Sequence, residues 1–272
     1  MAPWRAPAKP SPLLARILSA LVIAPPVLAA IHFGSPYVQV MILLAGAIAA
    51  WEWARVCGGG TLGGAGMLAV AVVVGALAAG LLAAYAAAAA VVCVGALATS
   101  LWTARRSPKA ALWLAAGVVY LPLACFAFAW LRLVPEDGRA IAYWLLATVW
   151  ATDTGAYAAG RALGGPKLAP AISPKKTWAG LAGGAVSAAA VGVAAAGLWQ
   201  GAEAWILAAA GSGLAIVAQA GDLFVSLWKR RFGVKDTSHL IPGHGGLLDR
   251  VDGLLAAGLA VSAYYWIAMT YL

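Results

Sequence analysis

The chain has 272 residues, of which 64% are hydrophobic and 10% are charged, with a formal net charge of +9. A mean hydropathy of +0.89 excludes an ordinary water-soluble domain and indicates an integral membrane protein. The positive charge does not indicate nucleic-acid binding, because no basic stripe lies on a soluble domain and membrane topology accounts for the cations better. We therefore expect a lipid bilayer, and no nucleic acid, as a partner.

Nine apolar segments are long enough to predict membrane-spanning helices. They lie at residues 13–31, 37–54, 65–84, 86–102, 111–131, 140–159, 178–199, 204–224 and 252–271. The third and fourth are separated by so little polar sequence that one long tilted segment is an alternative to a tight hairpin. The predicted fold class is all-α, a polytopic transmembrane bundle. It forms one membrane-embedded unit, with helices one to five in residues 1–139 and the catalytic helices six to nine in residues 140–272.

The distribution of cations supports this topology. If the amino terminus is cytoplasmic, sixteen of the 18 Lys and Arg residues fall in cytoplasmic segments, whereas Arg132 and Arg139 fall outside. This asymmetry follows the positive-inside rule when the third and fourth helices are counted separately. The first segment resembles a signal peptide in its basic flank, but no small-residue cleavage site leads into a polar domain. We expect a retained helix and a multi-pass protein of the cell membrane.

Carboxylates occur near the predicted cytoplasmic ends of helices six, eight and nine. Asp153 lies inside helix six, where a carboxylate is costly unless it faces a cation or a cavity, so it is a site candidate on physical grounds. If helix eight continues past the membrane interface, Gln219, Asp222, Ser226 and Arg230 form one polar stripe. The alternative is that this stripe is simply a water-facing helix end.

The most charged segment connects helices eight and nine. Residues 226–252 contain eight Lys, Arg and Asp side chains together with a glycine-rich run at 242–246. Asp249 and Asp252 begin helix nine, where amino-terminal capping is the alternative to a role in binding. A flexible backbone beside carboxylates and a helix amino terminus can approach phosphate oxygens closely, which favours a binding role.

The oxygen-rich character of this segment predicts a hard cation. We expect Asp222 and Asp249 to share divalent cations, because two nearby carboxylates repel each other without one. Mg²⁺ suits oxygen ligands, waters and substrate phosphates, whereas the Cys and His clusters typical of zinc sites are missing from the sequence. His244 is a candidate phosphate donor, and its alternative role is to order the loop.

A second basic loop precedes helix seven. Its residues Ser173, Lys175 and Lys176 are candidates for capturing a lipid or nucleotide phosphate. The alternative is a positive-inside anchor in which Ser173 caps the helix. ATP binding through a P-loop is excluded, because Pro166 intervenes in the motif and Leu168 replaces its hydroxyl residue.

Together these residues resemble the phosphatidate cytidylyltransferases, also called CDP-diacylglycerol synthases. The resemblance is carried by Ser226, Lys229, Arg230, Lys235, Asp236, Ser238, Pro242, His244, Gly245, Gly246, Asp249, Arg250 and Asp252, and by the earlier Asp153, Thr154, Gly155, Ala156, Tyr157, Gly160, Arg161 and residues 172–178. It covers about the carboxy-terminal half of the chain, whereas helices one to five resemble the family in hydropathy only. At Ala179 the chain departs from the acidic residue that many members have.

The resemblance implies that CTP and phosphatidate react to give CDP-diacylglycerol and pyrophosphate, with Mg²⁺ as the cofactor and the site on the cytoplasmic side. Asp222 and Asp249 would hold the cation, with Asp153 in support. The expected substrate-binding residues are Lys229, Arg230, Lys235 and Arg250 for the triphosphate of CTP, Ser173, Lys175 and Lys176 for phosphatidate, and Ser226 and His244 with no choice between the two substrates.

Two other activities are alternatives. One is a CTP-dependent transferase that acts on another lipid acceptor, and the other is a membrane transporter. A transporter is disfavoured, because the carboxylates cluster at one face rather than along a pathway at mid-membrane. The resemblance leaves a homodimer open.

Overall fold

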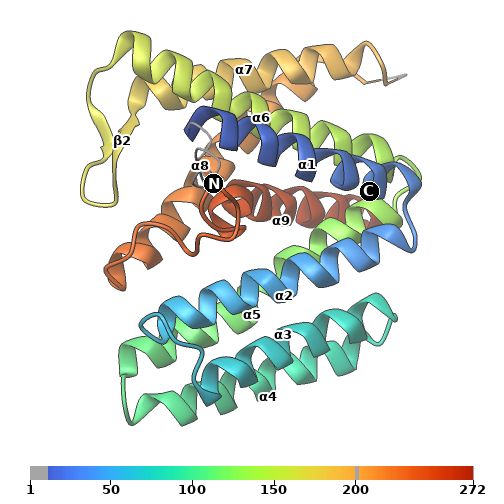
Figure 1. Ribbon diagram of the computed structural model, residues 1–272. Coiled ribbons are helices and arrows are strands. Elements are labelled where there is room, and N and C mark those ends of the chain that lie inside the picture. The colour runs from blue at the N-terminus through green and yellow to red at the C-terminus, as the bar shows by residue number, and fades with distance from the viewer. Residues whose placement is uncertain (1–11, 200–201, 272) are drawn as a thin grey trace, which may run out of the picture.

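The computed structural model describes residues 12–199 and 202–271, which form helices and one short β-hairpin (Figure 1). The elements are α1 (Pro12–Phe33), α2 (Tyr37–Cys57), α3 (Gly64–Leu81), α4 (Tyr85–Ala104), α5 (Pro108–Leu133), α6 (Gly138–Leu163), β1 (Lys167–Ala169), β2 (Ser173–Thr177), α7 (Trp178–Ala196), α8 (Ala204–Arg231) and α9 (Leu248–Tyr271). Each predicted apolar segment corresponds to one helix of this part of the chain.

The two segments with an ambiguous boundary are separate helices. The chain turns between α3 and α4 at Ala83, whose φ is 61°, in the left-handed region that rarely suits a non-glycine residue. This tight turn needs no polar residue, which explains why so little polar sequence separates the two helices.

Seven of the helices in the described residues are long and apolar enough to cross a membrane. The two others are α1, whose described apolar part at Leu18–Phe33 is shorter, and α6, which contains Arg139, Asp153 and Arg161. Large apolar side chains such as Leu44, Val94 and Val186 are exposed on the outside of the bundle, as a bilayer requires. The protein is therefore a mostly helical membrane protein.

The bundle has two groups of helices joined by α9. Helices α2 to α5 pack together at one side of the molecule, and α6 and α7 lie at the other (Figure 1). Helix α9 runs between them and contacts α5, α6 and α8. Because it contacts both groups, α9 fixes the position of the loop that precedes it.

Glycines allow α6, α7 and α8 to pack closely. A Cβ atom at Gly183 would lie 2.9 Å from the backbone oxygen of Gly155, and one at Gly192 would overlap the backbone of Leu207. The backbones of α6, α7 and α8 therefore approach to distances that only small residues permit, as is common between helices in membranes.

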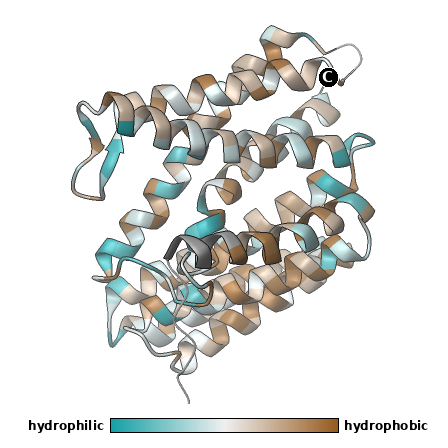
Figure 2. Cartoon of the chain, turned by 45° about the horizontal axis from the view of Figure 1, so that its top comes forward, coloured by the Kyte–Doolittle hydropathy of each residue, from teal (hydrophilic) through white to brown (hydrophobic). Residues whose placement is uncertain are grey.

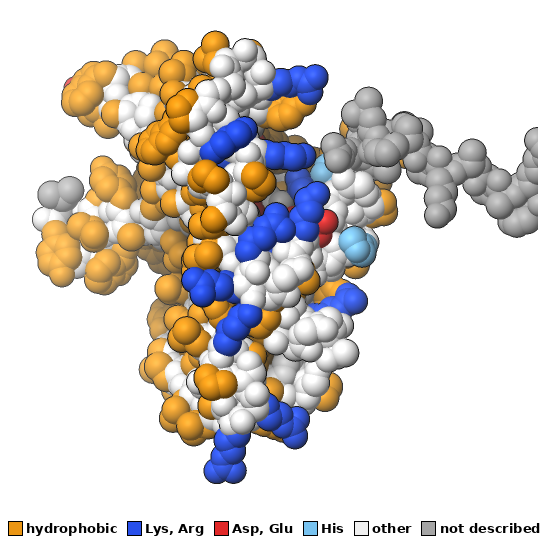
Figure 3. Space-filling model, turned by 90° about the vertical axis from the view of Figure 1, so that its left-hand side faces the viewer, with side chains coloured by type: hydrophobic (Ala, Val, Ile, Leu, Met, Phe, Trp, Pro, Cys, Tyr) orange, Lys and Arg blue, Asp and Glu red, His pale blue; other side chains and the backbone are white. Residues whose placement is uncertain are grey.

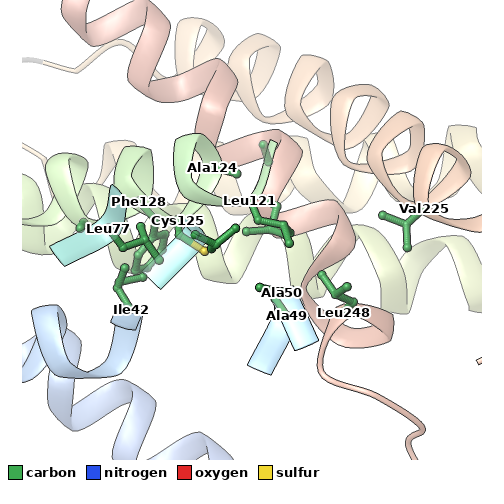
Figure 4. Packing of buried hydrophobic residues seen from close by; sticks show 14 of the residues in the cluster. Ile42, Ala49, Ala50, Leu77, Leu121, Ala124, Cys125, Phe128, Val225 and Leu248 are labelled. Carbon is green, nitrogen blue, oxygen red and sulfur yellow. The ribbon is translucent and has the colours of Figure 1, made fainter. Parts of the chain in front are cut away.

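An aromatic cluster anchors α2 and α5 to α8. The rings of Trp53 and Trp228 are stacked, with centroids 3.9 Å apart and planes 7° from parallel. Trp53 also donates from Nε1 to the backbone oxygen of Trp113 at 2.7 Å, and Phe224 packs against both Trp53 and Trp113. Leu248, the first residue of α9, is fully buried in the adjoining core (Figure 4).

One end of the bundle, which we call the hydrophilic end, holds a large group of hydrophilic residues, and a smaller group lies at the opposite end, around the connection between α5 and α6 (Figure 2). Figure 2 shows the large group in the hairpin, at the end of α8 and in the loop that follows it, whereas the helix centres are hydrophobic. Viewed from the hydrophilic end, Lys and Arg side chains spread across the surface around a small acidic area (Figure 3). Cations and carboxylates of the two charged segments, the loop before α7 and the segment between α8 and α9, therefore lie at the same end (Figure 2, Figure 3).

The hairpin corrects two details of the sequence-based prediction. The all-α class omitted β1 and β2, which pair antiparallel with Lys167 opposite Thr177 and Ala169 opposite Ser173. Ser173 does not cap α7, because Thr177 is the N-cap and its Oγ1 accepts from Gly180 N at 3.0 Å. The strands are too short for a pattern of alternation to reveal them.

Candidate active site

The ends of five elements meet at the hydrophilic end of the bundle. Contacts join β2 to α8 through Lys176 and Asp222, α8 to α9 through Lys229 and Asp249, and α5 to α8 through Lys109 and the Arg231 carbonyl. The end of α2 joins the loop of residues 232–247, which we call the α8–α9 loop. The predicted gathering of charged groups on one side of the molecule is therefore present.

Asp222 lies on the predicted polar stripe of α8. The helix continues to Arg231, so Ser226 lies one turn beyond Asp222 and donates from Oγ to Oδ1 at 3.1 Å. Lys176 Nζ lies 2.7 Å from Oδ2 of the same carboxylate. The Asp222 side chain is 33% exposed, so it keeps access to a ligand from solution.

The hairpin separates the three candidate phosphatidate residues. Successive side chains of a strand point to opposite faces, so Lys176 points to Asp222 whereas Ser173 and Lys175 point away from it. Arg230 holds the hairpin turn against α8, because its Nε donates to the Ile172 carbonyl at 3.3 Å. Lys176 therefore belongs with the carboxylate cluster, and Lys175 is exposed at the rim.

Asp249 is held more tightly than Asp222. Its Oδ1 lies 2.5 Å from Lys229 Nζ, and its Oδ2 accepts from Thr237 N at 2.9 Å and from Gly246 N at 3.0 Å. The side chains of Lys229 and Asp249 are only 10% and 4% exposed. Oδ1 contacts Lys229 in the described residues and keeps a second lone pair, since a carboxylate oxygen has two.

Two further carboxylates interact with Asp222. Asp153 of α6 and Asp252 of α9 interact electrostatically with Asp222 and with each other. Asp252 accepts from Gly253 N at 2.8 Å, which places its Oδ1 at the helix backbone. Asp153 also interacts electrostatically with Lys176 and Arg250, so the charges of α6, β2, α8 and α9 compensate each other in one cluster.

No group of three His, Cys, Asp or Glu side chains in the described residues is arranged to hold a metal by itself.

Glycines shape the α8–α9 loop near its end. Gly243 and Gly245 have φ of +76° and +85°, in the left-handed region that glycine adopts readily. Ile241 and Gly245 form a bridge, with Ile241 N donating to the Gly245 carbonyl at 2.8 Å. The resulting tight turn contains His244, which is partly buried.

The remaining candidates lie around this turn. His244 Nδ1 is 2.7 Å from Ser19 Oγ of α1, and Arg250 Nε donates to the His244 carbonyl at 3.0 Å. The contact with α1 agrees with the alternative in which His244 orders the loop. Lys235 is exposed near the start of the loop.

Sequence reasoning missed Glu52, a fully buried residue of α2 that contacts this loop. Its carboxylate accepts from Ser238 Oγ at 2.6 Å and from Leu247 N at 2.8 Å. A signal was present, because Glu52 is the single acidic residue before position 136 and lies in an apolar segment. It was overlooked because helices one to five matched the family in hydropathy only.

Comparisons with known proteins agree with the resemblance. Phosphatidate cytidylyltransferase of Brucella suis is 49% identical over 145 residues, which are 53% of this chain and 54% of that protein. The protein of the same name from Mycobacterium bovis is 38% identical over 154 residues, or 57% of this chain and 49% of that protein. The chain thus aligns with about half the length of these curated relatives.

A family model described as the cytidylyltransferase family matches residues 14–268. The match includes α2, with Glu52, as well as the hairpin, α8 and α9. It therefore extends beyond the carboxy-terminal half in which the sequence motifs lie, and on this evidence the protein belongs to the cytidylyltransferase family.

Proposed function

We propose that this protein is a phosphatidate cytidylyltransferase that converts CTP and phosphatidate to CDP-diacylglycerol and pyrophosphate. One observation carries the proposal: the Lys176–Asp222 and Lys229–Asp249 pairs lie at the same hydrophilic end of an otherwise apolar bundle. Alternating carboxylates and ammonium groups suit a reaction between two phosphate compounds. The cytidylyltransferase family model matches residues 14–268, which include the segments that supply these pairs.

The chemistry needs alignment and charge neutralisation rather than a strong base. A phosphate monoester has a second pKa of about 6, so phosphatidate is mostly dianionic at neutral pH. Its phosphate oxygen forms a bond with the α-phosphorus of CTP, and the bond from that phosphorus to the bridging oxygen breaks to release pyrophosphate. The protein must therefore hold two anions together against their repulsion.

The carboxylates and hydroxyl of the site fit Mg²⁺. Asp222, Asp249 and Ser226 offer oxygen ligands, and a cation that needs only one or two carboxylates takes the rest of its ligands from water and substrate phosphates. Asp222 and Asp249 would hold it, with Asp153 in support. When bound, Mg²⁺ would neutralise charge that develops on the departing pyrophosphate.

The basic residues then divide by position. Lys176 and Lys229 contact the two carboxylates, so they lie where the phosphates of CTP would meet the cation. Arg230, Lys235 and Arg250 come from α8, the α8–α9 loop and α9 and would bind the triphosphate, with Ser226 and His244 in support. Ser173 and Lys175 lie on the opposite face of β2 and would bind the lipid phosphate.

We place this site at the cytoplasmic face of the cell membrane, with nine spans that include α1 and α6. The charge asymmetry supports this orientation, since sixteen of the 18 cations then lie inside. CTP is a charged, soluble nucleotide, so an open cytoplasmic end suits it.

The test of the activity uses purified full-length protein, CTP labelled in its cytidine, Mg²⁺ and phosphatidate. We expect label in an organic-soluble product with equal release of pyrophosphate. Label that enters the organic phase only when an isoprenoid alcohol replaces phosphatidate would assign the protein to another CTP-dependent transferase reaction. Neither product with either acceptor would refute the proposed activity.

A further inference from the structure

Glu52 has surroundings that a merely structural helix residue does not require. It lies within the last two turns of α2, a helix apolar enough to span the membrane, and its side chain is fully buried. An ionisable side chain in such a segment is costly, and it usually marks a functional site with a specific partner. Here the partners lie in the first half of the α8–α9 loop and at its junction with α9.

Both carboxylate oxygens of Glu52 are used. Oε1 accepts from Ser238 Oγ at 2.6 Å and from Leu247 N at 2.8 Å. Oε2 accepts from Thr237 Oγ1 at 2.9 Å and from Leu248 N at 2.8 Å. Each oxygen thus binds one hydroxyl from the first half of the loop and one backbone N–H at the junction of the loop with α9, so one side chain connects these two parts of the chain.

Thr237 connects this network to Asp249. Its Oγ1 lies within hydrogen-bonding distance of Glu52 Oε2 at 2.9 Å and of Asp249 Oδ2 at 3.1 Å. The backbone N–H of Thr237 also donates to Asp249 Oδ2. Asp249 is therefore oriented from the side of Glu52, which leaves Oδ1 directed to Lys229.

The position of Glu52 is fixed by its neighbour in the sequence. Trp53 stacks on Trp228, and Trp228 precedes Lys229. The stacked rings hold α2 against α8, so Glu52 and Lys229 reach Asp249 from two helices whose separation is set by aromatic packing.

We propose that Glu52 is a positioning residue of the active site, which acts through the α8–α9 loop to aim Asp249 Oδ1 at the cation and the substrate phosphates. It touches neither substrate nor cation itself. This inference rests on the proposed cytidylyltransferase activity, and it assigns a task in that reaction to the amino-terminal half of the chain.

Glu52→Gln is the sharpest substitution. In either orientation of the glutamine amide, its NH₂ group faces the backbone N–H of Leu247 or of Leu248. Two donors then face each other, and the backbone N–H cannot rotate away. The size of the side chain is kept, whereas one end of the loop is released. Outer partners of metal ligands typically contribute about 10- to 100-fold to metal affinity or activity, and we expect a loss in this range.

The chain offers matched controls. Glu136→Gln makes the same chemical change at an exposed position between α5 and α6, at the other end of the bundle. Ser238→Ala removes one hydroxyl from Glu52 but none from Asp249, whereas Thr237→Val removes the hydroxyl that both carboxylates share.

The experiment measures two quantities on each purified protein: the affinity for Mn²⁺ by electron paramagnetic resonance, as a stand-in for Mg²⁺, and kcat with CTP and phosphatidate. Folding is checked by gel filtration in detergent. We expect Glu52→Gln to lose about 10- to 100-fold in both quantities, and Thr237→Val to lose more than Ser238→Ala. Glu136→Gln should stay within about twofold of the wild type, as exposed substitutions usually do.

Folded Glu52→Gln protein with wild-type Mn²⁺ affinity and kcat would overturn the inference. If that variant does not fold, equal Mn²⁺ affinities in Thr237→Val and Ser238→Ala would overturn it instead. A wild-type protein that binds Mn²⁺ but forms no CDP-diacylglycerol would contradict the proposed activity but not the role of Glu52. That role would still be tested by the Mn²⁺ affinities of the variants.

Discussion

Lys229 near the end of α8 and Asp249 at the start of α9 form a buried ion pair, with Nζ and Oδ1 2.5 Å apart. The pair joins the two helices across a loop that also contains the glycine turn. In water such a pair contributes little, but here both side chains are nearly inaccessible, so each charge depends on the other. It is both a structural tie and a part of the candidate site.

Removing the lysine should therefore destabilise the protein. We expect Lys229→Met to lower the free energy of unfolding by about 3 kcal/mol, because it leaves the Asp249 charge buried without a cation. The double variant Lys229→Met with Asp249→Leu should recover most of this loss but no activity. The measurements are thermal melting in detergent and the labelled-CTP assay; a double variant as unstable as the single one would show that the ion pair is not the source of stability.

The two neighbouring lysines of β2 should behave differently. Lys176 faces Asp222, and Lys175 is on the opposite face of the strand. Lys176→Met should lower kcat by about 10- to 100-fold, because it removes a hydrogen bond to a charged group. It should also change the dependence of kcat on Mg²⁺ concentration. Lys175→Met should raise the KM for phosphatidate and leave the Mg²⁺ dependence unchanged. Identical kinetic changes in both variants would contradict the assignment to opposite faces.

Gly246 should not tolerate a side chain. A Cβ atom there would overlap Thr237 Oγ1 and Glu52 Oε1, inside the network that orients Asp249. We expect Gly246→Ala to cost about 1–3 kcal/mol, as overpacking does, and to lower activity.

Gly213→Ala is the matched control, because a Cβ atom at that position in α8 meets nothing within 4 Å. It should melt at or slightly above the wild-type temperature, since alanine favours a helix over glycine. Equal effects of the two substitutions on melting and activity would exclude crowding as the cause.

The orientation in the membrane can be measured with single cysteines. Arg106→Cys lies between α4 and α5, and Glu136→Cys lies between α5 and α6, both exposed. With Cys93 replaced by Ala, a reagent that cannot cross membranes should label Glu136→Cys in intact cells and Arg106→Cys only after lysis. The reverse pattern would place the candidate site outside the cytoplasm.

Much of the fold could be predicted because a bilayer imposes a simple rule on the sequence. Long apolar segments located each helix. The polar spacing on α8 correctly predicted that Asp222 and Ser226 lie on one face of a helix that continues to Arg231. The hairpin was missed, because its strands are short and Pro174 and two lysines conceal any alternation.

The contacts of the site were less accessible from sequence, because they depend on residues that are distant in the chain. Glu52 is 185 residues from Thr237, yet their side chains are hydrogen-bonded. Local patterns report caps, turns and helix faces, whereas the choice of partner is decided by packing such as the Trp53–Trp228 stack. The roles of Asp222 and Asp249 as cation ligands stay a prediction.

The most direct test is the initial rate of CDP-diacylglycerol formation as a function of Mg²⁺ concentration, in the wild type, Asp222→Asn and Asp249→Asn. Asp137→Asn, an exposed change at the other end of the bundle, is the control. We predict that both site variants remain folded in the membrane and lose more than about 100-fold of the rate at every Mg²⁺ concentration, because even outer partners of a ligand contribute up to that amount. Near-normal rates in either variant would contradict the assignment of that aspartate as a cation ligand.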